Sequence, residues 1–243
     1  MSTILVTGGT GTLGTLVTPL LGDAKVRVLS RHAAGPEHFA CDLMTGAGLD
    51  AAVEGADVVL HLAGGPKGDD VATANLVRAA ERAGVGHFVL ISVIAADRVP
   101  LGYFTRKAEA EKTVVASSLP WTILRAAQFH GFCFDAVRAA AKLPVVPVPG
   151  GMRFQPVDAH DVAARLAALT LGAPAGRVPD LAGPKVYTMR ELVDDYLRAK
   201  GKRRPKLPVR LPGKAGRVYR AGENLNLDAE TGTGTWEEFL AEK

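Results

Sequence analysis

Residues 7–14 read Thr-Gly-Gly-Thr-Gly-Thr-Leu-Gly and decide the fold of this 243-residue chain. They follow a short apolar run and open an apolar stretch of helical length. In that context Gly8 permits a tight turn, Gly11 lets the backbone approach a pyrophosphate, and Gly14 allows a helix to pack closely on a strand. The amide groups and the dipole of the helix N-terminus favour phosphate. The stretch therefore predicts a dinucleotide-binding loop with contacts from Gly8, Thr10, Gly11, Thr12, Leu13 and Gly14.

Outward from this loop, β-branched runs alternate with Ala- and Leu-rich segments as far as about residue 125. The predicted strands are Thr3–Val6, Val26–Leu29, Val58–Leu62, Phe88–Ser92 and Trp121–Leu124. The predicted helices are Thr12–Leu21, Gly48–Val53, Asp70–Ala83 and Tyr103–Ser117. This alternation is typical of βαβ units around a parallel sheet. We expect an α/β fold, a Rossmann-type doubly wound parallel sheet.

The alternation loosens beyond residue 125, where Pro and Gly punctuate residues 143–151. Helices are expected near Asp161–Leu171 and Met189–Lys200, with Asp158 as the N-cap of the first. Residues 235–243 resemble a short amphipathic helix that docks on its own chain. No linker separates the parts, so we predict one domain over 1–243, with a dinucleotide-binding core at 1–125 and a substrate-side region at 126–243.

Bulk composition excludes several classes of protein. The chain is 47% hydrophobic, enough for a large core, and no apolar run approaches the roughly 20 residues of a membrane-spanning helix. The N-terminal residues show no signal-peptide pattern, so a cytoplasmic protein is expected. Cys41 and Cys133 are too few for a disulfide framework and lack the spacing of a zinc site. We interpret both as packing residues and expect no metal.

The net charge of +4 owes much to the segment Lys200–Lys206 and the basic residues that follow it. Such a cluster raises the possibility of a nucleic-acid partner. No aromatic residue interleaves with it before Tyr219, and no nucleic-acid-binding signature is present. A solvated loop is the favoured interpretation, and neither a nucleic-acid nor a membrane partner is expected.

The end of the second predicted strand indicates which dinucleotide binds. NAD-selective sites usually carry a carboxylate there for the ribose 2′-hydroxyl, whereas this chain has Ser30 and Arg31. A guanidinium pairs well with a phosphate dianion. NADP(H) is therefore favoured over NAD(H).

Other strand ends supply further cofactor contacts. Asp42 and Leu43 follow a short strand-like segment, and Asp42 is expected to accept a hydrogen bond from the adenine. Leu62, Ala63 and Gly64 end the next strand, where small residues leave room for the cofactor. His61 is interpreted as a packed strand-end histidine.

Tyr103 and Lys107 are spaced i, i+4 at the start of a predicted helix, so their side chains share one face. An ammonium near a phenol favours the phenolate and lowers its pKa. The pair is therefore suited to proton exchange with a carbonyl or alcohol oxygen.

Together, these motifs resemble those of the atypical short-chain dehydrogenase/reductase superfamily, in its NmrA-like, NAD(P)H-binding branch. The matching stretches are TGGTGTLG at 7–14, LSR at 29–31, DL at 42–43, HLAGG at 61–65, LIS at 90–92, YFTRKAEAEK at 103–112 and SLPWTILRAAQFHGF at 118–132. The resemblance covers nearly the whole chain.

The resemblance implies that Tyr103 is the catalytic acid/base and that Lys107 holds the nicotinamide ribose and tunes Tyr103. It further implies that Ser92 lies in the cofactor site and that Arg125, Ala126 and Phe129 lie near the nicotinamide. One departure matters, because active members usually place a Ser or Thr just after the first serine of this strand end. Here Val93 and Ile94 follow Ser92, so the donor that polarises the substrate oxygen is missing.

Three functions are compatible with these residues. The favoured one is an NADPH-dependent oxidoreductase that moves a hydride between nicotinamide and a small carbonyl, enone or quinone. The alternative, favoured by the missing serine, is a non-catalytic NADP(H)-binding sensor or regulator of NmrA type. An epimerase or dehydratase is less favoured, because only about 115 residues follow the sixth strand. An aromatic or quinone-like substrate would suit a pocket lined by some of Phe129, His130, Phe132, Phe134 and Phe154, in a monomer or homodimer.

Overall fold

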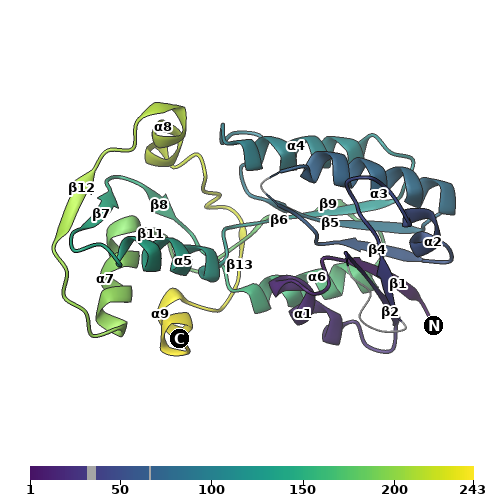
Figure 1. The fold of residues 1–243 in the computed structure, drawn as a ribbon, viewed down its shortest axis with the longest axis horizontal. Helices are drawn as coiled ribbons and strands as arrows, with labels where there is room; N and C mark the ends of the chain where they lie inside the picture. The colour runs from purple at the N-terminus through teal and green to yellow at the C-terminus, as the bar shows by residue number, and fades with distance from the viewer. Residues whose placement is uncertain (32–36, 66) are drawn as a thin grey trace.

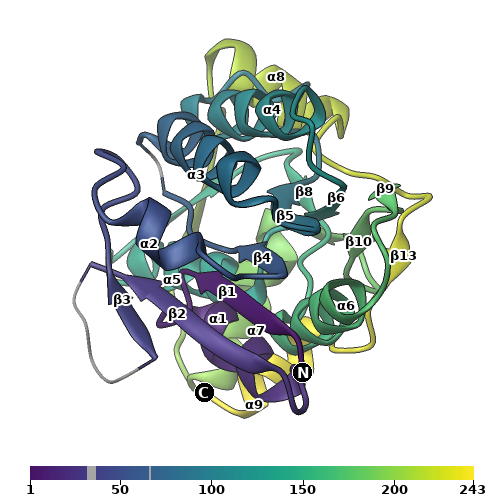
Figure 2. The same ribbon diagram turned by 90° about the vertical axis from the view of Figure 1, so that its right-hand side faces the viewer.

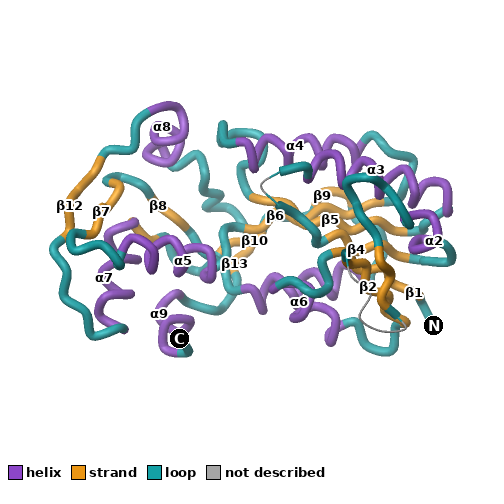
Figure 3. Tube along the Cα trace, viewed as in Figure 1, coloured by secondary structure: helices purple, strands orange, loops and turns teal. Residues whose placement is uncertain are grey.

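The computed structural model of the chain describes residues 1–31, 37–65 and 67–243. It has two lobes, with the N-terminal strands at one end and the β7–β12 ribbon at the other (Figure 1). The first lobe is a sheet covered by helices on both faces, and the second is a smaller assembly of short helices and strand pairs (Figure 3). The α/β class expected from the sequence is confirmed.

The central sheet has the strand order β13-β10-β6-β5-β4-β1-β2-β3, with β9 also paired to β6, and its strands pair in parallel. The six N-terminal strands give the order 3-2-1-4-5-6 of a Rossmann fold. The strands are β1 (Thr3–Thr7), β2 (Lys25–Ser30), β3 (His38–Ala40), β4 (Val58–His61), β5 (His87–Val93), β6 (Trp121–Ala126), β9 (Gly176–Arg177), β10 (Leu181–Ala182) and β13 (Glu230–Thr231).

Helices cover both faces of this sheet. On one face lie α1 (Thr12–Val17), its 3-10 continuation η1 (Thr18–Leu20) and α6 (Ala159–Leu171); on the other lie α2 (Leu49–Val53), α3 (Asp69–Ala83) and α4 (Gly102–Val115) (Figure 2). Left-handed glycines flank α3 at both ends, Gly68 before it and Gly84 after it. Glycine adopts that conformation at little steric cost, which fixes where the helix starts and stops. Each face of the sheet has its own apolar core.

The second lobe contains α5 (His130–Ala140), β7 (Val146–Pro149), β8 (Arg153–Phe154), β11 (Tyr187–Thr188), α7 (Met189–Ala199), β12 (Lys206–Val209), α8 (Gly213–Ala221) and α9 (Trp236–Ala241). β7 pairs with β12 in parallel, and β8 pairs with β11 antiparallel. Trp236 of α9 is fully buried and stacks on Phe239. The C-terminal helix thus docks on its own chain, as expected.

Residues beyond 126 contribute to both lobes, because α6, β9, β10 and β13 return to the first lobe. The predicted division into a cofactor core and a substrate-side region stays a prediction. All five predicted strands are present within two residues of their predicted ends. The structure adds α5, α8 and the short strands of the second lobe, which the sequence pattern did not indicate. None of the helices in the described ranges is long and apolar enough to cross a membrane.

Candidate cofactor and active site

The parallel sheet brings the predicted site residues to one edge. Thr7 at the end of β1 lies opposite Leu29 of β2 and His61 of β4. On the other side, Ser92 at the end of β5 lies opposite Arg125 of β6. In open α/β sheets, ligands bind outside this carboxyl edge where the strand order reverses, which here is between β1 and β4.

The loop between β1 and α1 has the geometry of a phosphate cradle. Gly8 has a φ of +69°, and a Cβ there would lie 2.7 Å from the backbone nitrogen of Ala63. A Cβ on Gly14 would overlap the carbonyl oxygen of Gly8 and the backbone of Gly9. Gly11, by contrast, is exposed, and a Cβ there would meet only the Gly8 oxygen at 3.3 Å. The first and third glycines are thus required by the fold, while Gly11 leaves an open approach for a pyrophosphate.

The neighbouring residues also fit this group. Thr10 and Thr12 are exposed on either side of Gly11, whereas Leu13 is buried under the loop. The amide groups in the first turn of a helix have no acceptors within the helix, so those of α1 are available to phosphate oxygens.

The ends of β2 and β3 carry the residues predicted to select the dinucleotide. Arg31 is exposed directly after β2, and no carboxylate occupies that strand end. Asp42 is exposed after β3, and its Oδ1 accepts a hydrogen bond of 2.8 Å from the backbone nitrogen of Met44. Leu43 is half-buried beside it. Contacts of Ser30, Arg31, Asp42 and Leu43 with a cofactor stay predictions.

His61 is the centre of a buried hydrogen-bond chain. The Ala63 amide donates to Thr7 Oγ1 (3.1 Å), and Thr73 Oγ1 donates to the Asp69 carbonyl (2.7 Å). Each hydroxyl has one proton, so His61 Nε2 must donate to Thr73 (3.0 Å) and Thr7 must donate to Nδ1 (2.6 Å). Burial, with a smaller effect of Lys107, lowers the pKa of His61 to about 3. His61 is therefore a neutral packing residue, as interpreted from the sequence, and it links β1 to the start of α3.

Lys107 is held in place by a residue that the sequence did not single out. Its Nζ lies 3.1 Å from Asp69 Oδ2 and donates to the Ile91 carbonyl at 3.2 Å, with both ionic side chains almost fully buried. A Cβ on Gly64 would lie 3.0 Å from this Nζ. A lysine has three donors, so one donor remains beside Gly64 for a ligand. In the sequence Asp69 resembles an ordinary acidic residue in the first turn of a helix, and only the fold brings it to Lys107.

Tyr103 lies in the first turn of α4, one turn before Lys107, and its ring packs edge-on against Phe104. Burial, with a smaller effect of the Asp69 carboxylate, raises the pKa of Tyr103 to about 12. The sequence-based expectation that Lys107 lowers this pKa is therefore wrong for the protein without its cofactor. The main reason is that burial disfavours the charged phenolate, and the Asp69 carboxylate adds a smaller effect of the same sign.

The segment after β5 contains no replacement for the missing hydroxyl. Val93 and Ile94 are buried, and Ser92 Oγ is buried without a hydrogen-bond partner in the described part of the chain. Ala95 then adopts a φ of +64°, a conformation that a non-glycine residue rarely takes. Unpaired buried polar atoms and strained backbone are common at ligand sites. Ser92 is thus available to a ligand, but Val93 and Ile94 are not oxygen-polarising groups.

The side chain of Arg125 is held by two carboxylates. Its Nε and Nη2 donate to the two carboxylate oxygens of Glu111 (2.7 and 2.6 Å), and its Nη1 donates to Asp97 (3.0 Å). This clamp ties β6 to α4 and to the loop before α4. Arg125 therefore supports the helix that carries Tyr103, while a contact of Arg125 or the buried Ala126 with nicotinamide stays a prediction.

Glu111→Gln should lower the free energy of unfolding by about 2 kcal/mol, because a buried guanidinium loses its charged bidentate partner. Urea denaturation monitored by circular dichroism measures this loss. Glu109→Gln is the matched control, since its exposed pair with Lys112 contributes at most about 0.5 kcal/mol. Equal effects of the two variants would contradict the clamp.

The aromatic residues proposed to line a pocket are mostly core residues. Phe154 packs against Tyr219, and the His130 and Phe134 rings pack against Phe239. Phe132 is 64% exposed, and Phe129 is half-buried after β6. Among the five, Phe129 and Phe132 are the ones left to face a ligand.

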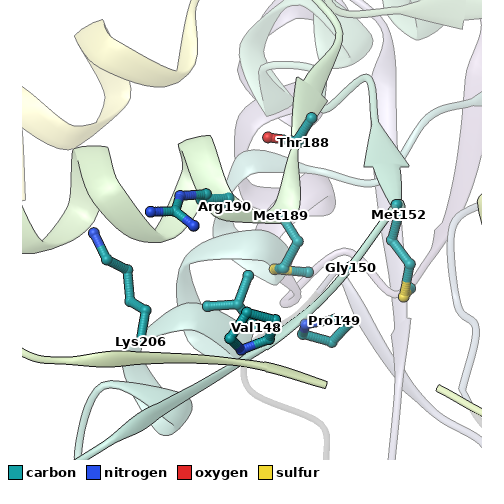
Figure 4. Close-up of a pocket in the computed structure, with 10 residues that line it drawn as sticks. Val148, Pro149, Gly150, Met152, Thr188, Met189, Arg190 and Lys206 are labelled. Atoms are coloured by element: carbon teal, nitrogen blue, oxygen red, sulfur yellow. The ribbon is translucent and has the colours of Figure 1, made fainter. Parts of the chain in front are cut away.

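A hollow of about 260 Å³ lies in the second lobe, between the β7–β12 ribbon and the start of α7 (Figure 4). It is lined by apolar side chains such as Val148, Met152 and Met189, with Arg190 and Lys206 also on its wall. No residue of the phosphate cradle and neither Tyr103 nor Lys107 lines it. We therefore do not assign it to the reaction.

Comparison with known proteins shows what the chain is similar to. Residues 8–170 match the model of the NAD(P)H-binding family. The chain is 33% identical over 214 residues to (4-alkanoyl-5-oxo-2,5-dihydrofuran-3-yl)methyl phosphate reductase of Streptomyces griseus, which covers 82% of this chain and 74% of that protein. It is 30% identical to NAD(P)H azoreductase of Xenophilus azovorans, with the same coverage of both chains.

A similar fold is seen in the NADPH complex of the NADPH-dependent quinone oxidoreductase 2 of Escherichia coli. The two structures superpose with a TM-score of 0.84 at 21% identity, over 98% of this chain and 99% of that one. At this level of identity the likeness concerns the fold.

Proposed function

The chain belongs to the NAD(P)H-binding family of atypical short-chain dehydrogenases/reductases, and from this premise we propose that it is an NADPH-dependent reductase. Its substrate is a small carbonyl, enone or quinone. Tyr103 donates the proton, and Lys107 binds the nicotinamide ribose.

The observation that carries the proposal is the arrangement of Tyr103, Lys107 and Asp69. Lys107 is fixed by Asp69 and the Ile91 carbonyl, with one donor left over beside Gly64. Tyr103 lies one turn earlier on the same helix and is 38% exposed, so a ligand can reach it. A purely structural ion pair between Lys107 and Asp69 would not require a partly exposed tyrosine one turn before the lysine.

NADPH, when bound, supplies the hydride for the substrate. The chain's own residues bind and orient the reactants and move the proton. The cradle around Gly11 binds the pyrophosphate, and Ser92 and the free donor of Lys107 hold the nicotinamide half. The Tyr103 hydroxyl gives its proton to the oxygen or carbon that becomes electron-rich.

The Tyr103 phenol is in its protonated form at neutral pH, as a proton donor in a reduction must be. With a pKa of about 12, the phenol is protonated at neutral pH and is ready to donate. A protonated donor agrees with the reductase names of the relatives.

Relatives also guide the substrate class. Their names describe reductases of an unsaturated oxo-furan phosphate and of azo compounds, and the structural neighbour is a quinone oxidoreductase. These acceptors share a conjugated, flat reducible group. We propose an acceptor of this kind, with Phe129 and Phe132 as its apolar contacts. NADPH-oxidation assays across quinones, enones, azo dyes and aldehydes test this proposal.

Arg31→Glu should weaken NADPH binding by about 10- to 100-fold and leave NADH binding unchanged or stronger. A charged hydrogen bond to the 2′-phosphate is worth about 1.5–3 kcal/mol, and glutamate would repel that phosphate. Calorimetric titration with both cofactors measures the effect. Lys25→Glu, the same charge change at the other end of β2, is the control. Unchanged selectivity in Arg31→Glu would contradict the assignment of Arg31.

A second function is favoured by one specific observation. Val93 and Ile94 leave no side-chain hydroxyl where active relatives polarise the substrate oxygen. A protein that binds NADP(H) without turnover, as a regulator, would not need that group. Tight NADPH binding with no turnover on any acceptor would favour this function over the reductase.

A further inference from the structure

One segment of this chain is basic and contains no acidic residue. Residues 200–222 contain nine Lys and Arg and no Asp or Glu. Because nine of the 29 basic residues lie there, the other 220 residues carry 20 basic and 25 acidic side chains, a net charge of −5. We call residues 200–222 the basic segment. It runs from the end of α7 through β12 to α8, along the end of the second lobe away from β1 and β2 (Figure 1).

The charges of the basic segment are largely unpaired. Lys206 forms an ion pair with Asp194, and among the ion pairs of the described residues no other member of the segment takes part. Lys202, Arg203 and Arg204 are exposed and line a hollow of about 590 Å³ next to α7. Adjacent unpaired cations repel one another. An anionic partner would relieve that repulsion.

Exposed aliphatic side chains lie beside these cations. Leu207 is 55% exposed and Leu211 is 39% exposed, both within the basic segment. Leu143 and Val145 lie just before β7, the strand that pairs with β12, and are 48% and 42% exposed. The pairing of Lys206 with Val146 and of Leu207 with Pro147 brings the two groups together on one ribbon.

We infer that this end of the second lobe docks on the surface of an anionic phospholipid bilayer. Cations attract the negatively charged headgroups, and short aliphatic side chains enter the interface, which is the combination that surface-bound proteins use. This goes against the expectation from the sequence that no membrane partner exists. The sequence indicated the basic run, but not that Leu143, Val145, Leu207 and Leu211 are exposed next to it.

Charge and side-chain chemistry favour a bilayer over nucleic acid. Single-stranded nucleic acid is bound by basic grooves with aromatic side chains on which bases stack. Tyr219 is the one aromatic residue of the basic segment, and it is buried. Four exposed aliphatic residues have no role in such a groove, whereas they suit a lipid interface.

The inference does not depend on the proposed function, since vesicle binding is measured without turnover. Failure of the reductase proposal would leave it intact.

Co-sedimentation with vesicles tests the inference, using phosphatidylcholine alone and phosphatidylcholine with 30% phosphatidylglycerol. The full-length protein should bind the anionic vesicles at least about tenfold more tightly, and 0.5 M salt should abolish the difference. Arg203→Glu with Arg204→Glu should reduce binding at least about tenfold, since each cation contributes about fivefold. Leu207→Ser should reduce it about threefold at unchanged charge.

The matched control is Arg82→Glu with Lys112→Glu, the same charge change on exposed residues of α3 and α4. It should keep vesicle binding within about twofold of the unchanged protein. Circular dichroism and NADPH titration verify that all variants are folded. Equal binding to both vesicle types, or equal losses in the basic-segment and control variants, would overturn the inference.

Two other outcomes would also overturn it. One is binding of a 30-nucleotide DNA with no vesicle binding, which would make nucleic acid the partner. The other is self-association in analytical ultracentrifugation, abolished by the Arg203 and Arg204 changes, with no vesicle binding. The partner would then be a second copy of this chain, attracted through the acidic residues outside its basic segment.

Discussion

Tyr103→Phe should lower kcat for NADPH-dependent reduction by about 10²- to 10⁴-fold, the contribution typical of a positioned general acid. The affinity for NADPH should change by less than about threefold, because phenylalanine keeps the packing against Phe104. Stopped-flow measurement of NADPH oxidation, with the acceptor found in the screen, separates the chemical step from binding.

The control for this prediction is Tyr196→Phe, the same substitution in a buried tyrosine of α7 that packs against Phe134. Its kcat should stay within about twofold of the unchanged protein. If Tyr103→Phe retains full turnover, another group supplies the proton. In that case the assignment of Tyr103 fails, even though the cofactor site would stand.

The second large effect is expected at Gly14, where any side chain would overlap backbone atoms of Gly8 and Gly9. Since backbone cannot move aside as a flexible side chain does, Gly14→Ala should lower the free energy of unfolding by about 3 kcal/mol. It should also weaken NADPH binding at least about 30-fold, because the cradle and the start of α1 must separate. Urea denaturation and calorimetric titration measure the two losses.

Gly11→Ala and Gly131→Ala separate the fold from the ligand. A Cβ on Gly11 would lie 3.3 Å from the Gly8 carbonyl oxygen, a tight contact that needs only a small shift, so this variant should lose much less stability than Gly14→Ala yet lose affinity for NADPH. A Cβ on Gly131, in α5, meets nothing within 4 Å and should leave both properties unchanged or raise stability slightly. Normal NADPH binding in Gly14→Ala would contradict the predicted role of the loop.

The first lobe could be predicted from the sequence because its signals are local. The glycine pattern at 7–14, the β-branched strands and the Ala- and Leu-rich helices each act within a few residues, and the parallel sheet then fixes which ends meet. The second lobe was less predictable, since β8 and β11 are two-residue strands and β7 contains two prolines. Such short strands are stabilised by tertiary contacts between residues far apart in the chain, and a local sequence pattern does not show those contacts.

The residues of the site also divide into those with a local sequence signal and those without one. Tyr103 and Lys107 are found from their i, i+4 spacing, which is local. The partners that set their chemistry are distant in the chain: Asp69 is 38 residues from Lys107, and Asp97 and Glu111 neutralise Arg125 from two other segments. The error about the pKa of Tyr103 arose because the sequence shows the lysine but neither the burial of the phenol nor the carboxylate paired with the lysine.

The return of α6, β10 and β13 to the first lobe has a consequence for biosynthesis. When residue 126 leaves the ribosome, the six N-terminal strands are complete, but the face that α6 covers and the edge that β10 and β13 extend are still bare. Another 105 residues must be translated before β13 ends, roughly 5 to 20 seconds at ordinary elongation rates. During that interval the nascent chain exposes apolar surface of α1 and an open strand edge. Chaperone demand should therefore peak late in translation, and rare codons between 126 and 231 would prolong it.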